Sequence, residues 1–309
     1  MGADEREEEQ GRARALVSAY LSYAADVRRL SPHTVRAYEG DLADFLAWCR
    51  REGVGAIDLS RTSLRAYVAS LTRAGYAAKT VNRRLSALKS FYHWLEREGV
   101  AQADAIDSLR GRKVARTLPK TLADKDVDRM IQVCDDTDAG RRDRAFLELL
   151  YASGARISEM ASARPEDIDY GQGQMRLFGK RAKERIVPLY DRAIREVASY
   201  VADVRPRLVA ARKKEGSADA LFVSTRGNNM SADALRRCYH RHRELAGIDA
   251  GLTPHSVRHT YATELLQGGA DLQAVQELLG HESLATTQIY THLTVDRLKA
   301  VAARAHPRG

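Results

Sequence analysis

The sequence predicts a mainly α-helical chain in two domains, of which the second carries a small antiparallel β-sheet. Its 309 residues suit two domains that each bury a core of their own. Apolar residues recur at helical spacing along most of the chain, whereas one stretch in the second half alternates with a period of two. Between the halves the helical pattern fails, and Gly111, a basic run and Pro119 indicate a linker. We therefore expect one domain over residues 11–106, a linker over 107–117 and a second domain over 118–309.

Three helices are expected in the first half, within residues 30–50, 61–75 and 77–99. Ser31 can cap the first helix, and Pro32 suits its first turn. The buried face of this helix is formed by apolar residues at helical spacing, which are Val35, Tyr38, Leu42, Phe45, Leu46 and Cys49. The acidic amino terminus, "ADEREEEQ", is expected to be frayed.

The third helix places four cations beside its apolar stripe. Lys79, Arg83, Arg84 and Lys89 lie mostly off the stripe, which consists of Val81, Leu85, Leu88, Tyr92 and Leu95. A charged face of this kind is usually only solvated, and that interpretation stays open. Because few acids balance the four cations, a face that binds phosphates is an equally good interpretation. We predict the four cations as candidate DNA-binding residues.

The period of the pattern changes in the second half. Two helical stretches, within residues 121–131 and 141–154, come first. A β-hairpin is then expected, with a strand Met175–Phe178, a tip "GKRAKE" and a return strand Arg185–Leu189. Helices resume near Asp191 and continue to the end, with loops at "STRGNNMS" and "IDAGLTP".

The balance of charge favours a polyanionic partner. The chain carries 50 Lys and Arg against 41 Asp and Glu, a formal net charge of +9 at pH 7. The three cysteines, Cys49, Cys134 and Cys238, form no CxxC pair and suit a reducing compartment. No apolar run approaches the ~20 residues that span a bilayer, and the amino terminus lacks the apolar stretch of a signal peptide. We expect a cytoplasmic protein.

Sequence motifs for nucleotides and metals are missing. There is no GxxxxGKS or GxxxxGKT loop, no GxGxxG after a strand, no HExxH and no Asx-rich calcium loop. His255 and His259 have the i, i+4 spacing of metal ligands on a helix, but few acids near them offer a third ligand. The sequence therefore predicts neither a cofactor nor a metal.

Six side chains along the second half have chemistry that phosphodiester cleavage would use. They are Arg156, Lys180, His255, Arg258, His281 and Tyr290. Each has an ordinary structural explanation when it is taken alone; Arg156, for example, is expected to pair with Glu159 at the surface. His255 and Arg258 are one helical turn apart, so they share a face.

Together the six residues suggest an attack on a phosphodiester that needs no metal. In-line attack builds negative charge on the equatorial oxygens, and an arginine presents a planar pair of donors to them where a lysine offers a point charge. Preorganised donors can replace the metal ion of other phosphoryl-transfer enzymes. Tyrosine, with a pKa of about 10, is a weak nucleophile while protonated. The phosphotyrosine that it forms nevertheless keeps the bond energy for rejoining, and a lysine can protonate the leaving oxygen.

Four stretches carry all six residues: "LLYASGARISEM", "GKRAKERIVPL", "LTPHSVRHTYAT" and "AVQELLGHESLATTQIYTHL". With them the chain resembles the tyrosine recombinases, the phage-integrase-like family, and most closely the bacterial Xer chromosome-dimer recombinases. The family's order of Arg, Lys, His-x-x-Arg, His and Tyr is reproduced, with Tyr290 nine residues after His281. "LSPHTVRAYEGDLADFLAWC" and "KTVNRRLSALKSFYHWL" resemble the family's amino-terminal domain, so the resemblance covers nearly the whole chain.

The resemblance implies a role for each residue. Tyr290 would attack the scissile phosphate and form a 3′-phosphotyrosyl link, which frees a 5′-hydroxyl. Arg156 and Arg258 would hold the non-bridging oxygens. His255 would help to accept the tyrosine proton, and His281 would hydrogen-bond the phosphate.

The proton donor has two candidates. Lys180 would protonate the leaving 5′ oxygen, and it is favoured because it directly follows Gly179 at the end of the strand. Lys183, on the same hairpin tip, stays open as the alternative. His259 has no role in the family's pattern and is expected to be structural.

The resemblance also implies an architecture and an assembly. Residues 11–106 would form a four-helix-type, SAM-like core-binding domain, and residues 118–309 a mixed helical catalytic domain with the small sheet. The two would clamp a specific double-stranded DNA site. Four protomers, identical or a XerC/XerD pair, would resolve chromosome dimers at a dif-like site through a Holliday junction. Residues 294–307 would dock on a neighbouring protomer, and a septal DNA translocase is a further partner implied by the resemblance.

Three alternative functions stay open on the sequence alone. A type IB topoisomerase uses the same chemistry to relax DNA without choosing a site. A phage or transposon integrase uses it on other targets. A DNA-binding factor could carry the same residues without catalysis. The expected core-binding domain favours recombination over relaxation.

Overall fold

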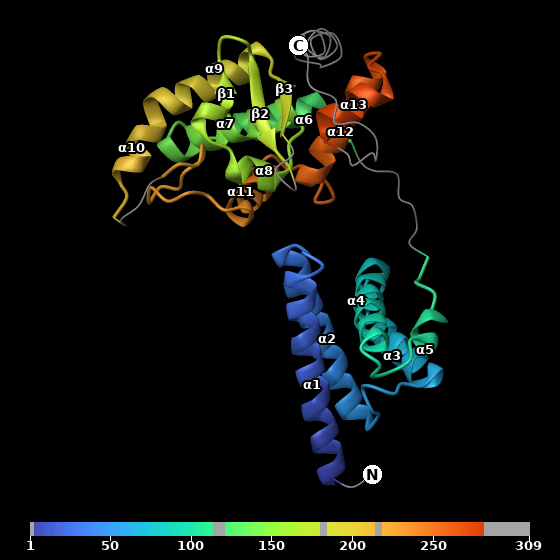
Figure 1. Cartoon of the computed structure of the whole chain (residues 1–309). Helices are drawn as coiled ribbons and strands as arrows, with labels where there is room; N and C mark the ends of the chain where they lie inside the picture. The colour runs from blue at the N-terminus through green and yellow to red at the C-terminus, as the bar shows by residue number, and fades with distance from the viewer. Residues whose placement is uncertain (1–2, 114–120, 180–183, 214–217, 281–309) are drawn as a thin grey trace. The chain divides into compact units, whose positions relative to one another are not determined.

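Amphipathic helices build the first half of the chain (Figure 1). The computed structural model describes residues 3–113, 121–179, 184–213 and 218–280. The chain divides into two units, Met1–Thr117 and Leu118–Gly309. The first unit contains α1 (Ala3–Asp26), α2 (Pro32–Glu52), α3 (Arg61–Arg73), α4 (Ala78–Arg97) and the short α5 (Asp104–Asp107). Helix α2 packs against both α1 and α4.

Short polar side chains start two helices of this unit. The Ser31 hydroxyl accepts the backbone N–H of Thr34 at 3.2 Å, so Ser31 caps α2 as predicted. Ser60 caps α3 in the same way, with the backbone N–H of Ser63 at 3.1 Å. Gly53 ends α2 with a φ of +66°, a left-handed conformation that glycine adopts without strain. The predicted positions of these helices are confirmed.

The prediction of a frayed amino terminus is wrong, because α1 begins at Ala3 and continues to Asp26. One face of α1 is buried in the unit's core through side chains at helical spacing, which are Ala13, Val17, Tyr20 and Ala24. Two of the four are alanines, so a strong apolar stripe is missing from the sequence. Packing against α2 and α4 stabilises a helix that its own composition does not predict.

Aromatic rings fill the centre of the first unit. The ring centroids of Phe45 and Tyr67 lie 5.1 Å apart in an edge-to-face arrangement, and those of Tyr20 and Phe91 lie 5.4 Å apart. Edge-to-face pairs contribute about 0.5–1.5 kcal/mol beyond the apolar area that they bury. The helices α1 to α4 are therefore fixed to one another by rings that each of them supplies.

The second unit is mixed, as predicted. Its elements are α6 (Asp124–Gln132), α7 (Asp138–Ser153), α8 (Ile157–Ser162), the 3₁₀ turn η1 (Pro165–Asp167), β1 (Ile168–Asp169), β2 (Gln174–Phe178), β3 (Glu184–Pro188), α9 (Asp191–Ser199), the π-helical turn η3 (Tyr200–Val204), α10 (Arg205–Ala210), α11 (Ala232–Leu245), α12 (Pro254–Gln267) and α13 (Leu272–Leu279). Helix α7 contacts α6, α9, α12 and β3, so it is the central element (Figure 1).

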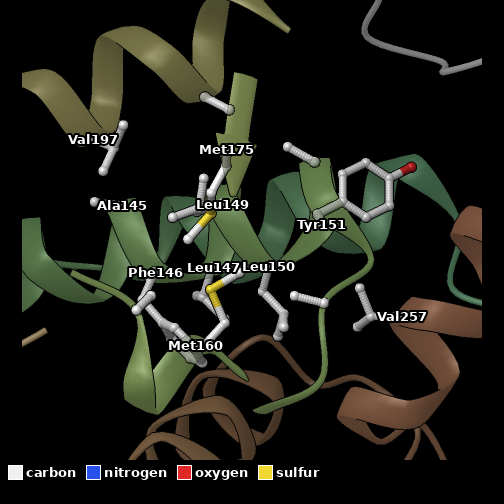
Figure 2. Close-up of a cluster of buried hydrophobic side chains, with 14 of the residues drawn as sticks. Ala145, Phe146, Leu147, Leu149, Leu150, Tyr151, Met160, Met175, Val197 and Val257 are labelled. Carbon is white, nitrogen blue, oxygen red and sulfur yellow. The ribbon is translucent and has the colours of Figure 1, made fainter. Parts of the chain in front are cut away.

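Figure 2 shows why α7 lies at the centre. Its segment "AFLELLYAS" is apolar on nearly all sides, and every residue in it is buried. Four surrounding elements each supply a labelled apolar side chain to this core: Met160 from α8, Met175 from β2, Val197 from α9 and Val257 from α12. The helix that ends just before Arg156 is thus held on every side.

A three-stranded antiparallel sheet with the order β1-β2-β3 packs on this helix. The predicted hairpin is confirmed, with Phe178 opposite Glu184 and Gln174 opposite Pro188. Strand β1 was not predicted, because two residues are too few for an alternating pattern. The tip of the hairpin, residues 180–183, lies outside the described residues.

The region between the units is only partly described. Leu109, within the predicted linker 107–117, is buried in the core of the first unit. The predicted domain limits, 11–106 and 118–309, stay predictions. Among the described residues, no helix combines the length and the apolar character needed to cross a bilayer.

Candidate active site

A left-handed glycine ends α7 and sets the position of Arg156. Gly154 has a φ of +55°, and a Cβ atom added there would lie 2.6 Å from Cδ1 of Tyr261. Tyr261 is fully buried and has no room to yield, so both the backbone conformation and the space require glycine. The chain then extends at Arg156, with φ −74° and ψ 147°, before α8 begins at Ile157. Arg156 therefore lies at a break between two helices.

Arg258 reaches the same break from α12. Its guanidinium is buried, with 5% of the residue exposed, and Nη1 donates to the carbonyl of Gly154 at 2.9 Å. Nη2 donates to the carbonyl of Leu279 at the end of α13. One turn earlier on α12, His255 is exposed. The predicted pair of His255 and Arg258 is thus on one helix, with the arginine buried and the histidine open to solvent.

Glu159 holds Arg156 from the first turn of α8. Its Oε2 accepts the backbone N–H of Arg156 at 2.7 Å, and its Oε1 accepts Nη1 of the same arginine at 2.8 Å. Arg185 on β3 donates to both carboxylate oxygens as well, Nη1 to Oε1 at 2.8 Å and Nη2 to Oε2 at 2.6 Å. The expected pair of Arg156 and Glu159 is present, but it is not a surface pair, because only 4% of Glu159 is exposed.

Three arginines meet the last two carbonyls of α13 and the carbonyl of the glycine that follows it. Arg185 donates to the carbonyl oxygen of Leu278 at 2.7 Å. Arg258 donates to that of Leu279, and Arg156 donates to that of Gly280 at 3.5 Å. The last carbonyls of a helix have no partner within it and carry the negative end of the helix dipole. Arginines from three separate elements therefore bind the end of α13.

Guanidinium groups outnumber carboxylates in this cluster. Burial, together with the like charges of Arg156 and Arg185, lowers the pKa of Arg258 to about 10. Burial would raise the pKa of Glu159, yet the hydrogen bonds and charge of Arg185, with those of Arg156, lower it to about 2. All four groups are charged at neutral pH. The arginine cluster, defined as Arg156, Glu159, Arg185 and Arg258, therefore carries two positive charges in excess.

Such a cluster is suited to bind a phosphate. The Arg156 side chain is its most open member, with 41% exposure, and the buried Arg258 lies behind it on the same junction. Guanidinium groups bind phosphate oxygens through pairs of parallel hydrogen bonds. Because Arg258 is held by backbone carbonyls on both sides, little reorganisation is needed when an anion binds.

Three of the six predicted catalytic residues fall in the described part of the chain. The structure brings Arg156 and Arg258 together, with His255 one turn from Arg258. Lys180, His281 and Tyr290 lie outside the described residues, as does the alternative donor Lys183.

Two members of the cluster were missed by the sequence analysis. Glu159 was considered only as a surface partner, and Arg185 only as the start of a strand. A signal for Arg185 does exist, since β3 alternates and Arg185 is in phase with the buried Val187. A cation at an inward-facing strand position requires a buried partner, and here that partner is Glu159.

The four predicted DNA-binding residues of α4 differ in exposure. Lys79 is exposed and Lys89 is half-buried. Arg83 is exposed, but its Nη1 pairs with the buried carboxylate of Asp41.

The structure does not support Arg84 as a DNA ligand, because only 8% of the residue is exposed. Its Nη2 pairs with Asp44 at 2.6 Å, and its guanidinium lies over the ring of Tyr76 at 4.4 Å. The apolar stripe of α4 therefore includes this arginine, whose charge is balanced by acids that α2 supplies. Arg84 therefore has a structural role, because it joins α4 to α2.

Neither His255 nor His259 belongs to a group of three metal-ligand types among the described residues. Asp143, Cys238 and His242 do form such a group away from the arginine cluster. There Oδ1 of Asp143 accepts two bonds from the adjacent Arg142, at 2.8 and 2.7 Å, and Nε2 of His242 lies 3.4 Å from Oδ2. The protein's own donors thus occupy this carboxylate.

The chain thus has a helical unit, followed by a helical unit with a small sheet and a cluster of arginines. Comparison with known proteins identifies the family. Residues 120–297 match the family described as "Phage integrase family", and residues 17–99 match "Phage integrase, N-terminal SAM-like domain". Tyrosine recombinase XerC of Pelotomaculum thermopropionicum is 37% identical over 299 residues, which cover 94% of this chain and 98% of the relative. Tyrosine recombinase XerD of Pseudomonas putida is 38% identical over 295 residues, which cover 95% and 98%.

The fold resembles that of a solved integrase structure. The crystal structure of a lambda integrase(75-356) dimer bound to a COC' core site aligns with a TM-score of 0.67 at 17% identity and covers 96% of each chain. This chain belongs to the phage integrase family of tyrosine recombinases. It is a site-specific recombinase of the kind to which the Xer proteins belong. The predictions of family, fold class and enzyme class are confirmed.

Proposed function

We propose that this chain resolves chromosome dimers by recombination at a dif-like site. Support comes from its similarity, over nearly its whole length, to relatives named XerC and XerD. The similarity to the two branches is almost equal, 37% and 38%, so a partner of either kind is compatible with it. The active assembly is a tetramer of identical or paralogous protomers, and a septal DNA translocase is its further partner. The cytoplasmic location predicted from the sequence belongs to the same proposal.

The observation that carries the chemistry is the convergence of Arg156 and Arg258 on one junction. They are 102 positions apart in the printed sequence, yet Arg258 donates to the carbonyl two residues before Arg156. A scissile phosphate bound there would lie against both guanidinium groups. The charge that grows on its non-bridging oxygens would then be stabilised without a metal ion.

The remaining roles complete the reaction. The Tyr290 hydroxyl attacks phosphorus, the bond to the 5′ oxygen breaks, and a 3′-phosphotyrosine forms. His255 accepts the tyrosine proton, His281 donates a hydrogen bond to the phosphate, and Lys180 protonates the departing 5′ oxygen. Attack by a 5′-hydroxyl from the partner duplex reverses these steps and yields a Holliday junction after the first exchange.

DNA binding by the first unit involves cations of α4 that are exposed or half-buried. Lys79, Lys89 and Arg83 are candidate phosphate ligands on α4, and Arg83 is already partly neutralised by Asp41. Phosphate contacts of this kind position a duplex and make its affinity fall with salt.

Replacement of the nucleophile tests the reaction. The cognate site is first identified by sequencing genomic DNA that is covalently trapped on the wild-type protein in cells. On a nicked suicide substrate of that site, Tyr290→Phe is expected to bind with unchanged affinity but to form no covalent adduct on a denaturing gel. Loss of the phenol removes the only group that forms the covalent bond.

Tyr170→Phe is the matched control. Tyr170 is 40% exposed and lies between β1 and β2, away from the arginine cluster. This variant should form adducts at the wild-type rate. Adduct formation by Tyr290→Phe would overturn the assignment of the nucleophile.

A further inference from the structure

Arg185 is a buried cation that the six proposed catalytic residues do not include. Only 3% of it is exposed, and it lies on β3 in phase with the buried Val187. Burial of a charged side chain is strongly unfavourable unless all of its charge is paired. Arg185 therefore depends on the groups that pair its charge.

The contacts of Arg185 join two parts of the arginine cluster. Its two terminal nitrogens bind the two oxygens of Glu159 at 2.8 and 2.6 Å, and its Nε donates to the carbonyl of Leu278 at 2.7 Å. The fork fixes the plane of the carboxylate, because two parallel bonds leave it no freedom to rotate. The same guanidinium fixes the end of α13 through the third bond.

The turn that follows α13 also lies against Arg185. Gly280 has a φ of +62°, and a Cβ atom added there would lie 3.3 Å from Nη1 of Arg185. A larger residue in this position would press on the guanidinium. Arg185 therefore underlies the last described residue of the chain, which directly precedes His281 in the sequence.

Arg185 also limits how far the carboxylate of Glu159 neutralises Arg156. Each oxygen of Glu159 accepts one bond from Arg156 and one from Arg185. If Arg185 were absent, the carboxylate would be free to form a two-bond pair with the Arg156 guanidinium alone. That pair would neutralise the most open cation of the site and turn it away from an incoming phosphate.

We propose that Arg185 is a positioning residue for the recombination reaction: with Glu159 it fixes Arg156 and the end of α13 in the geometry that receives the scissile phosphate. The proposal rests on the proposed function. Arg185 acts through Glu159, Arg156 and the carbonyl of Leu278, so it affects the rate of the chemical step more than the affinity for DNA. Misplacement of reacting groups by about 1 Å lowers a rate on the order of 100-fold.

The test compares Arg185→Lys with Arg142→Lys. Arg142 is a matched control in the same unit, because it is 8% exposed, binds the carboxylate of Asp143 through Nε and Nη2, and donates to the carbonyl of Val223 at 3.1 Å. Lysine keeps the charge in both variants but cannot make three directed bonds. Both variants are expected to lower the Tm by a similar few degrees.

Three quantities are measured on each full-length variant with the cognate site. They are the Tm, the Kd for the site by gel shift, and the single-turnover rate of adduct formation at saturating protein. Arg185→Lys should keep its Kd within about threefold of wild type and lose on the order of 100-fold in the rate. Arg142→Lys should keep both. Equal rates for the two variants would overturn the proposal.

A second substitution keeps the test decisive if Arg185→Lys does not fold. Glu159→Gln retains the size of the side chain and weakens the same fork, so it should show the same split between affinity and rate. Where both variants fold, the double variant should lose about as much rate as either single variant, since the two residues act as one unit. Additive losses would contradict the shared mechanism. Failure of the wild-type protein to form adducts would instead contradict the proposed function. This outcome can be distinguished from a failure of the positioning role of Arg185.

Discussion

A buried guanidinium that remains charged is the central feature at the scale of single residues. Burial and two like charges lower the pKa of Arg258 to about 10, which still leaves it protonated at neutral pH. A phosphate that binds beside Arg156 and Arg258 relieves their repulsion. The stability lost by crowding these cations is thus regained when the anion binds, which favours binding of the more highly charged transition state.

The acid that balances the cluster predicts a pH dependence of stability. Contacts with Arg185 and Arg156 lower the pKa of Glu159 from 4.5 to about 2, so its stabilising effect is fully present above pH 4.5 and is lost as the pH falls towards 2. The shift corresponds to about 3 kcal/mol in the free energy of unfolding. The difference in stability between wild type and Glu159→Gln should therefore shrink by about this amount between pH 5 and pH 2.

The measurement follows the second unit separately. Both tryptophans, Trp48 and Trp94, lie in the first unit, so a circular-dichroism transition without a change in tryptophan fluorescence reports the second unit. Glu166→Gln, which removes an exposed glutamate of the same unit, is the control. A stability gap for Glu159→Gln that stays constant over this pH range would refute the role assigned to its charge.

Only some residues of the candidate site could be predicted from the sequence. The sequence makes Arg156, His255 and Arg258 candidates, because their types and order match a reaction. It does not identify Arg185 or the burial of Arg84, because the partners that make such burial possible, Glu159 and Asp44, come from other elements. Only the folded chain shows which acid faces which arginine.

At the scale of elements, the junction of α7 and α8 decides the geometry of the site. Helix α7 is held in the core on all sides, and Gly154 turns the chain so that Arg156 leaves the helix. A rigid element that ends in a left-handed residue places a side chain more accurately than a loop does. The end of α13, bound by three arginines, is the second fixed point.

Gly154→Ala should disrupt this junction. The new Cβ would lie 2.6 Å from the buried ring of Tyr261, and alanine disfavours a φ of +55°. Backbone strain and overpacking together are expected to destabilise the second unit by about 2–4 kcal/mol. Gly269→Ala is the control, because Gly269 has a φ of +89° and no atom within 4 Å of the added Cβ, so only about 1 kcal/mol of strain remains. Equal losses in chemical denaturation would show that the Tyr261 contact has no effect.

Elements with a strong pattern were predictable, and those without one were not. The helix α2 and the hairpin of β2 and β3 follow from caps, apolar spacing and alternation. The helix α1 was missed because half of its buried face is alanine and its first turns are acidic. The strand β1 is too short to carry a period, and it forms because β2 offers it backbone partners.

At the scale of the whole molecule, the excess positive charge and the two units are both consistent with a protein that acts on DNA. A net charge of +9 favours association with DNA, and the helical unit and the catalytic unit each contribute cations. The fold class and the family follow from pattern and resemblance, and both are confirmed by the match of residues 17–99 and 120–297 to the family's two domains.

In the proposed reaction, Arg156 and Arg258 neutralise the charge on the non-bridging oxygens of the scissile phosphate. A methylphosphonate at the scissile position replaces one non-bridging oxygen by a methyl group and removes the single negative charge of the diester. We predict that Arg258→Ala slows adduct formation by at least about 100-fold on the ordinary phosphate, and that most of this loss disappears on the methylphosphonate. A loss of the same size on both substrates would contradict the account, because Arg258 would then act on something other than the phosphate charge.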